Sequence, residues 1–154
     1  MTVHDAIDWK FCAFNALGLQ ELHDLLQLRT EVFVVEQNCV FQDIDGTDAQ
    51  AFHLLGLQDK QLVAYARCFP AGVKFAEASI GRVITRASVR GTGVGHRLID
   101  KAIESVGALW GPQAICIGAQ ARLAKYYSGH GFVDLDRPYV EDGIDHLEMR
   151  WQPF

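Results

Sequence analysis

The chain has 154 residues, 49% of them hydrophobic, and a formal net charge of −5 at pH 7. This length supports one complete hydrophobic core and is short for two, so we predict a single domain over residues 1–154. The acidic charge and the thinly spread basic residues argue against a nucleic-acid partner, because neutralising phosphates needs a concentrated face of Lys and Arg.

The sequence also lacks the marks of a targeting or membrane segment. The stretch Met1–Ala6 has neither the cationic nor the long apolar region of a secretory signal, and no run approaches the roughly 20 apolar residues that span a bilayer. We therefore expect a soluble cytoplasmic protein with no membrane partner. The four cysteines and six histidines are dispersed, which predicts free, mostly buried thiols and no metal site.

The first third of the chain predicts a strand, a helix and a loop. Residues 8–13 suit a strand, and leucines at helical spacing over 19–28 predict a helix that continues to about Phe33. The following stretch, 36–51, is polar and carries three aspartates around Gly46, which indicates a loop.

The next elements predict two hairpins. The β-prone runs 53–57 and 62–69 are separated by a short polar stretch, which is a hairpin pattern. Residues 70–72, with the sequence Pro-Ala-Gly, break the chain before a further strand over 78–85, so a second hairpin is expected there.

The hydrophobic period changes after this strand. Apolar residues at i, i+3 and i+4 predict a helix that begins near Gly93 and ends before Gly111. The apolar run 114–119 is typical of a strand buried on both faces of a parallel sheet region. Strand 78–85, the helix and strand 114–119 should therefore form a βαβ unit with a right-handed crossover.

The C-terminal part predicts a short helix near 123–128 and strands near 132–135 and 146–151. The whole chain is thus expected to be an α/β (α+β) domain. Its mixed, mostly antiparallel sheet should have about six to seven strands, about four flanking helices and one parallel βαβ crossover.

The most informative segment is Arg90–Gly95, whose sequence RGTGVG lies between the predicted strand and helix. Glycines permit positive φ and let a ligand approach the backbone, and the first N–H groups of a helix are unpaired donors at its positive end. Such a turn can hold a pyrophosphate, although a turn that merely connects two elements is the alternative. Four basic residues around it suit a phosphorylated small molecule: Arg82, Arg86, Arg90 and Arg97.

Spacing separates the known phosphate-binding turns. A P-loop ends in G-K-[ST], whereas Gly95 is followed by His96 and Arg97. A dinucleotide turn has the spacing G-x-G-x-x-G directly after its strand, whereas here the glycines run G-x-G-x-G and residues 86–90 separate them from Thr85. Neither nucleotide motif fits.

A third motif does fit. The pattern R-x-x-G-x-G, matched by Arg90, Gly93 and Gly95, resembles the pyrophosphate loop of the GNAT acetyltransferase superfamily. Downstream, Tyr126–Phe132 is similar to that family's Y-x-x-x-G-F ending, in the expected order and one helix and one strand away.

The resemblance covers most of the chain and extends to one branch of the family. Segments Arg29–Gln37 and Gln42–Gly46 resemble the ElaA-like branch. Two positions depart from the common pattern, because Gln120 stands where many members have Asn and Leu123 stands where a small residue is common.

The resemblance implies a V-shaped cofactor cleft between strands 78–85 and 114–119, with acetyl-CoA as co-substrate. Backbone groups of Val83, Ile84 and Thr85 would bind the pantetheine arm, and Gln120 would offer its amide. The pyrophosphate would be held by Arg90, Gly91, Thr92, Gly93, Val94, Gly95 and His96.

For the chemistry, the resemblance implies direct transfer of an acetyl group to a primary amine in a ternary complex. Tyr127 matches the family's usual acid for the departing thiolate, with a packing tyrosine as the alternative. The general base is left open between Glu36, Glu77 and His53. Glu36 is preferred because it follows helix one.

The resemblance implies that the acceptor is a small-molecule or peptide amine, which the sequence does not name. Two aspartates of the first loop, Asp43 and Asp45, and two acidic residues of the last, Glu141 and Asp142, could attract a cationic amine or serve only as turn residues. Two other functions stay open: an acyl-homoserine-lactone-synthase-like acyltransferase and a non-catalytic CoA-binding module. A homodimer is also left open.

Overall fold

The computed structural model describes residues 6–153. Residues 1–5 and 154 lie outside the described part, and with them His4 and most of the stretch considered as a secretory signal. The described residues form one seven-stranded sheet with the order β1-β2-β3-β4-β5-β7-β6. Its strands are β1 (Asp8–Ala13), β2 (Phe52–Gln58), β3 (Gln61–Phe69), β4 (Ala78–Thr85), β5 (Ile115–Gln120), β6 (Val133–Glu141) and β7 (Ile144–Trp151).

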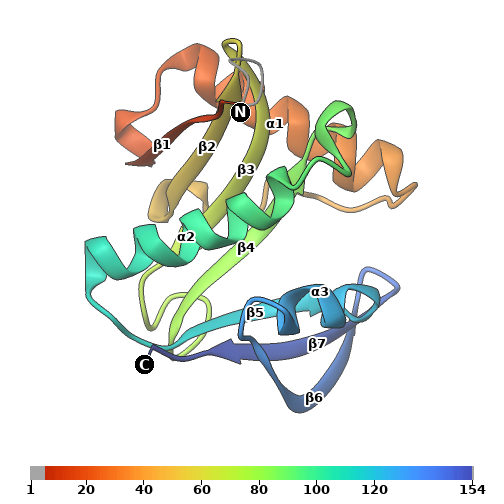
Figure 1. Ribbon diagram of the computed structural model, residues 1–154. Coiled ribbons are helices and arrows are strands. Elements are labelled where there is room, and N and C mark those ends of the chain that lie inside the picture. Colours follow the sequence, from red (N-terminus) through yellow and green to blue (C-terminus); the bar gives the residue numbers. More distant parts are fainter. Residues whose placement is uncertain (1–5, 154) are drawn as a thin grey trace.

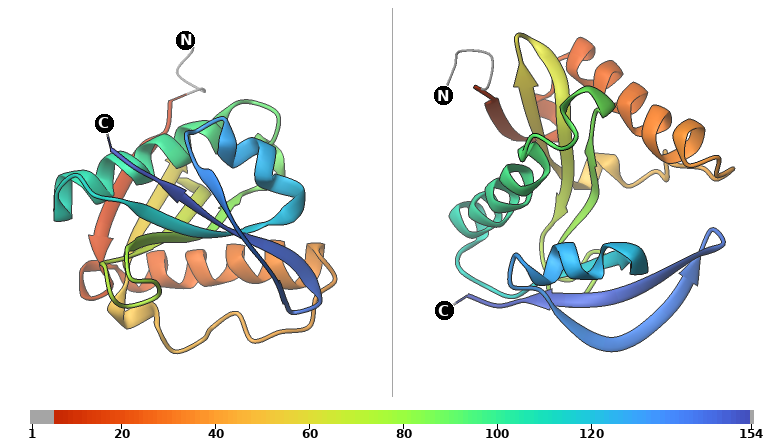
Figure 2. Two further views of the ribbon diagram at one scale, coloured as in Figure 1. Left: turned by 90° about the horizontal axis from the view of Figure 1, so that it is seen from below. Right: turned by 45° about the vertical axis from the view of Figure 1, so that its right-hand side comes forward.

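Three α-helices pack on the sheet within residues 6–153, where about four helices were expected: α1 (Leu19–Arg29), α2 (Val94–Trp110) and α3 (Ala124–Ser128). Helix α1 covers one face of the sheet, whereas α2 and α3 lie on the other (Figures 1 and 2). No helix in the described range is long and apolar enough to cross a membrane.

The two faces of the sheet carry separate apolar clusters. The buried stripe of α2, which includes Leu98, Ala102 and Val106, packs in the larger cluster. On the opposite face, Leu25 and Leu28 of α1 join a smaller cluster with residues of β2, β3 and β4. Each helix therefore holds one side of the sheet, as the helical spacing of its apolar residues predicts.

A β-bulge changes the direction of side chains in β4. The β3–β4 register shifts between Tyr65 and Arg67, and Arg82 has φ +49°, in the left-handed region that a non-glycine residue seldom adopts. Because of the extra residue, Ile80 belongs to the cluster under α2 and Ile84 to the cluster under α1. Their even spacing would place both on one face of a regular strand.

The sheet divides between β4 and β5. In the described part of the chain these parallel strands pair only at Ala78 with Ile115 and at Ser79 with Cys116, while β5 continues along β7 as far as Gln120. The two strands diverge beyond that point (Figure 1). The division leaves the last residues of β4 without a strand partner on the β5 side. The resemblance implied a cleft at this place.

Most predicted elements are confirmed, and the main differences lie in three of them. Strands 8–13 and 78–85 are found as predicted. Helix one is longer than predicted, because the π-helical segment Thr30–Glu36 continues from α1. Strand β6 runs to Glu141 rather than to about 135, and β5 is shifted by one residue, with Gly118 exposed rather than buried.

Candidate active site

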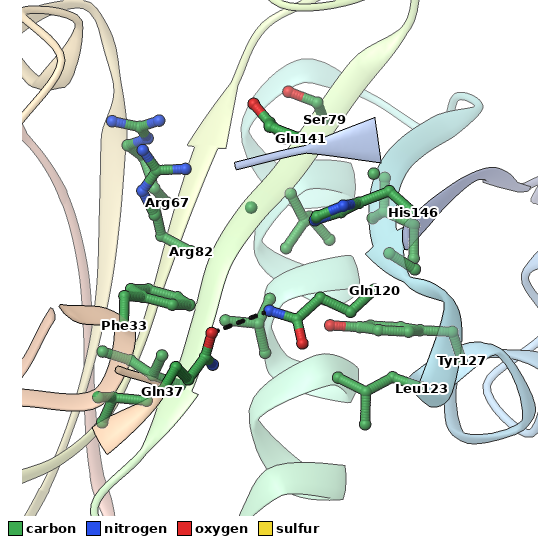
Figure 3. Close-up of a pocket in the computed structure, with 18 of the residues that line it drawn as sticks. Phe33, Gln37, Arg67, Ser79, Arg82, Gln120, Leu123, Tyr127, Glu141 and His146 are labelled. Carbon is green, nitrogen blue, oxygen red and sulfur yellow. Dashed lines mark hydrogen bonds between the residues drawn. The ribbon is translucent and has the colours of Figure 1, made fainter. Parts of the chain in front are cut away.

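A cavity of about 500 Å³ lies where β4 and β5 separate. Its lining includes residues of β4 on one side and residues of β5, β7 and α3 on the other. Figure 3 shows Phe33, Gln37, Arg67 and Arg82 on one side of this cavity, and Gln120, Tyr127 and His146 on the other. The division of the sheet thus exposes the end of β4 to a space large enough for a small substrate.

A second cavity, of about 410 Å³, lies at the glycine turn. Most of the predicted cofactor-binding residues line it: Val83, Ile84, Thr85, Arg90, Gly91, Gly93, Gly95 and His96. Tyr127 and Leu123 line both cavities. A long, thin molecule could therefore extend from the glycine turn to the divided strands past Tyr127.

The glycine turn has the backbone geometry that its composition predicts. Gly91 and Gly93 have φ of +79° and +88°, and Gly93 is the N-cap of α2. The first intrahelical bond runs from the Arg97 N–H to the Gly93 carbonyl, over 3.2 Å. The N–H groups before it are the unpaired donors of a helix N-terminus, where an anion is favoured.

Aromatic and histidine side chains pack beside this turn. A Cβ on Gly95 would lie 3.0 Å from the Tyr126 hydroxyl, so glycine permits this close contact. The Tyr126 ring also contacts the ring of His96, with centroids 4.7 Å apart. Nδ1 of His96 hydrogen-bonds Nε2 of His130 over 2.8 Å, and Nδ1 of His130 lies 2.9 Å from the Asp100 carboxylate.

Two predicted cofactor-binding residues do not line either cavity. The Val94 side chain is buried in the larger apolar cluster. The Thr92 hydroxyl donates a hydrogen bond to the Val89 carbonyl. A contact of either residue with a ligand would therefore go through the backbone.

Arg90 connects the glycine turn to the segment after α1. Its guanidinium pairs with both carboxylate oxygens of Glu36 and donates to the Thr85 carbonyl over 2.9 Å. The hydrogen bond from Arg90 lowers the pKa of the Glu36 carboxyl, outweighing a small effect of burial. Glu36 does line the larger cavity, but its ion pair makes it a weaker proton acceptor.

Tyr127 is buried, with 7% of its surface exposed, and its hydroxyl points into the cavity (Figure 3). Burial raises the pKa of this phenol, so the hydroxyl keeps its proton at neutral pH. The neighbouring Gln120 amide donates to Oε1 of Gln37 over 3.3 Å and accepts from Nε of Arg122 over 3.0 Å. The first of these bonds joins the two sides of the cavity.

The structure places the other two candidate bases away from the cavity lining. His53 is fully buried between the Tyr65 hydroxyl, 2.6 Å from its Nδ1, and the Asp48 carbonyl, 2.9 Å from its Nε2. Glu77 accepts hydrogen bonds from Nε of Arg150 over 3.0 Å and from Cys116 Sγ over 2.8 Å. Burial lowers the pKa of His53, so it is a satisfied, neutral core histidine.

The aspartates of the first loop have a structural role that the sequence analysis did not foresee. Arg29 is fully buried and donates to the carboxylates of Asp43 and Asp48 over 2.8 and 2.7 Å. Arg67 pairs with Asp45 and Asp48, and Nε of Arg82 donates to Asp43 over 2.7 Å. Because arginines occupy these carboxylates, Asp43 and Asp45 are poor candidates for attracting an amine.

Three residues of the β6–β7 hairpin line the cavity: Tyr139, Glu141 and His146. The sequence analysis considered Glu141 only as a residue that attracts a cationic amine, and it missed Tyr139 and His146. The Tyr139 hydroxyl packs where a Cβ of Gly118 would lie, so Tyr139 would have to move to admit a larger residue there. The Tyr139 and His146 rings stack with centroids 5.2 Å apart. The alternation of His146 with Glu148 and Arg150 in the predicted last strand was a signal that His146 shares the polar face.

Comparison with solved structures identifies the class to which this architecture belongs. The chain is similar to an acyl-CoA N-acyltransferase from Pseudomonas aeruginosa, with 41% identity and a TM-score of 0.87 over 94% of this chain and 99% of that one. The crystal structure of Escherichia coli ElaA gives 40% identity and a TM-score of 0.88 over 96% and 100% of the two chains. The divided sheet is therefore that of an acyl-CoA N-acyltransferase fold.

Sequence comparison gives the family. A model described as an acetyltransferase (GNAT) domain matches residues 20–153. Protein ElaA of Escherichia coli K12 is 41% identical over 145 residues, which are 93% of this chain and 95% of that protein. The chain belongs to the GNAT acetyltransferase family, as its motifs at Arg90–Gly95 and Tyr126–Phe132 predicted.

Proposed function

We propose that this protein transfers an acetyl group from acetyl-CoA to a primary amine by direct attack in a ternary complex. One observation carries the proposal: the cavity at the glycine turn and the cavity between the divided strands share Tyr127. The cavity at the glycine turn suits a diphosphate, and the cavity between the divided strands leaves space for an acceptor beside the same hydroxyl.

The cofactor side of the proposal uses backbone groups. The N–H groups at the start of α2 bind the pyrophosphate, since Gly91 and Gly93 let the chain turn there and α2 adds its positive end. Backbone groups of β4 from Val83 to Thr85, which have no β5 partner, bind the pantetheine arm. One of their N–H groups polarises the thioester carbonyl, as an oxyanion hole does.

Tyr127 is the proposed acid of the reaction. When the amine nitrogen bonds to the carbonyl carbon, the C–S bond breaks and its electron pair stays on sulfur. Burial raises the pKa of the Tyr127 phenol, so the hydroxyl is protonated at neutral pH and has a proton to give when the thiolate forms. The Tyr127 hydroxyl points into the cavity, which supports proton delivery to that sulfur.

Arg90 and Glu36 contribute to the site as a pair in this proposal. The Arg90 guanidinium lines both cavities and lies beside the Thr85 carbonyl, so it can turn toward the pyrophosphate and add charge complementarity. Glu36 then orients Arg90. The prediction from the sequence that Glu36 is the base stays untested, and its ion pair argues for the orienting role.

The test is thiol release from acetyl-CoA in the presence of a panel of amines. The panel contains ethylamine, 2,2,2-trifluoroethylamine, a polyamine, free amino acids and a short peptide. Amine-dependent release of CoA thiol, with one acylated amine formed per thiol, is the expected result. Saturable acetyl-CoA binding without turnover of any amine would contradict catalysis and favour a CoA-binding module instead. Turnover only with longer acyl-CoAs would contradict acetyl-CoA as the donor.

A further inference from the structure

His146 has a fixed orientation and a fixed tautomer. Its Nδ1 lies 2.7 Å from the carbonyl oxygen of Ile144. A carbonyl oxygen can only accept, so Nδ1 carries the hydrogen and the neutral ring has its lone pair on Nε2. The residue is buried in β7, and stacking on Tyr139 keeps the ring in this position.

The lone pair of His146 lies on the side of the cavity that holds Tyr127. His146 is the register partner of Gln120 on β5 and of Tyr139 on β6, so these three side chains share one face of the sheet. Figure 3 shows the His146 ring extending into the cavity on the same side as Gln120 and Tyr127. A substrate nitrogen between β4 and β5 would therefore face both a proton donor and a proton acceptor.

The other proton acceptors near the cavity are less suitable. The Glu36 carboxylate is held by both ends of the Arg90 guanidinium, and neither His53 nor Glu77 lines the cavity. Glu141 does line it, but from the exposed end of β6. His146 is buried in the cavity wall. Its one hydrogen bond among residues 6–153 uses Nδ1, so Nε2 is left to accept a proton.

Resting on the proposed function, we propose that His146 is the general base that takes the proton from the acceptor amine. Nε2 removes one proton from the bound ammonium, and this proton passes to solvent. The neutral nitrogen forms the N–C bond, the C–S bond breaks, and Tyr127 protonates the thiolate. The nitrogen's second proton replaces the one that Tyr127 gave. Acyl-CoA and R–NH₃⁺ thus yield the acylated amine, CoA–SH and one H⁺.

Two substitutions test this role, because a buried histidine also contributes to folding. In His146→Asn the amide nitrogen can keep the bond to the Ile144 carbonyl, whereas in His146→Gln an amide lies near the position of Nε2. Neither side chain accepts a proton from an ammonium. His23→Asn is the matched control, since His23 is exposed on α1 and lines neither cavity.

The discriminating probes are ethylamine and 2,2,2-trifluoroethylamine, which are similar in shape. Ethylamine is almost entirely an ammonium near neutral pH, whereas the fluorines withdraw electron density and leave the second amine largely neutral. A base is required for the first amine far more than for the second. In either variant kcat with ethylamine should fall roughly 10²- to 10⁴-fold, while kcat with trifluoroethylamine should fall by less than about tenfold.

Each outcome decides the proposal. The proposal is supported if both His146 variants lose kcat with ethylamine far more than with trifluoroethylamine and keep the wild-type dissociation constant for acetyl-CoA. The His23→Asn control should match the wild type in all three measurements. Equal losses with both amines, or wild-type rates in both variants, would show that His146 is not the base while leaving the proposed function intact. A larger selective loss in Glu36→Gln would assign the base to Glu36. A wild-type protein that acylates no amine would overturn the proposed function and this inference together.

Discussion

The position of Tyr127 in the fold suits it to its proposed role as the acid of the reaction. A surface tyrosine has a pKa near 10, which already exceeds neutral pH. Burial raises the pKa of Tyr127 further, and its ring packs edge-on against Phe132, with centroids 5.8 Å apart. The ring therefore belongs to the larger apolar cluster, while the hydroxyl faces the cavity. Because the ring makes the packing contacts, the hydroxyl can be removed with little effect on packing.

Replacing Tyr127 by Phe should reduce catalysis and leave folding intact. Loss of the acid is expected to lower kcat by about 10²-fold or more. Because the ring remains, the melting temperature and the acetyl-CoA dissociation constant should stay close to wild type. Thiol-release kinetics and a thermal melt check these expectations. A wild-type kcat in Tyr127→Phe would assign thiolate protonation to another group.

At the scale of elements, one glycine caps α2 and another lies within it, and the two have opposite backbone conformations. Gly93 caps the helix with φ +88°, a conformation that costs an L-residue roughly 1–2 kcal/mol. Gly107 lies within the helix, and a Cβ there would meet no neighbouring atom within 4 Å. The same substitution should therefore have opposite effects at the two positions.

Gly93→Ala should destabilise the protein by about 1–2 kcal/mol and weaken acetyl-CoA binding, because the turn would change shape. Gly107→Ala should stabilise it by about 0.5–1 kcal/mol without altering binding. Urea unfolding and calorimetric titration measure the two effects. Equal acetyl-CoA affinity in both variants would mean that the glycine turn does not bind the cofactor.

The sequence predicted elements best where one periodicity dominates. The apolar stripe of α2 and its flanking glycines, Gly93 and Gly111, defined that helix closely. Strand β6 was predicted too short because its second half is an exposed edge that contains Asp136 and Pro138, and neither residue favours a strand. The π-helical segment that follows α1 has no sequence pattern that distinguishes it from an ordinary helix.

At the scale of the whole molecule, a buried ionic network joins elements that are distant in sequence. Arg29 of α1, Arg67 of β3 and Arg82 of β4 share the carboxylates of the loop after the π-helical segment. Three arginines face three aspartates, Asp43, Asp45 and Asp48, so the charges balance. The network fixes this loop against the sheet next to the cavity.

Asp48→Asn should destabilise the fold, since it leaves Arg29 and Arg67 undercompensated. Breaking a buried pair in this way costs about 3–5 kcal/mol. The effect should depend on pH. Burial acts to raise the pKa of Asp48, but hydrogen bonds from Arg29 and Arg67 outweigh it and lower the pKa below its ordinary value. The stabilisation is therefore full above about pH 4 and is lost as the pH falls below it.

Thermal melts at several pH values test the direction of this pH dependence. The difference in melting temperature between wild type and Asp48→Asn should be constant near neutral pH and narrow below about pH 4. The buried neutral His53 also reduces stability in acid, because only the unfolded histidine gains a proton easily. Both proteins keep His53, so its effect largely cancels in the difference. A difference that widens in acid would contradict the account.

The sequence predicted the site in part. Local motifs gave the glycine turn and Tyr127, because their geometry depends on nearby residues. The network around Asp48 and the position of His146 depend on pairing between distant strands and on the bulge at Arg82. No short pattern encodes those contacts. Residues whose role depends on long-range register were therefore missed or assigned to another role.

The central claim is that the glycine turn and the divided strands bind coenzyme A, and calorimetric titration of the purified protein with acetyl-CoA tests it most directly. The account predicts saturable binding at one site per chain, competition by free CoA and weaker binding in Gly93→Ala. No heat of binding for any acyl-CoA at concentrations up to about 1 mM, with the protein folded throughout, would contradict it.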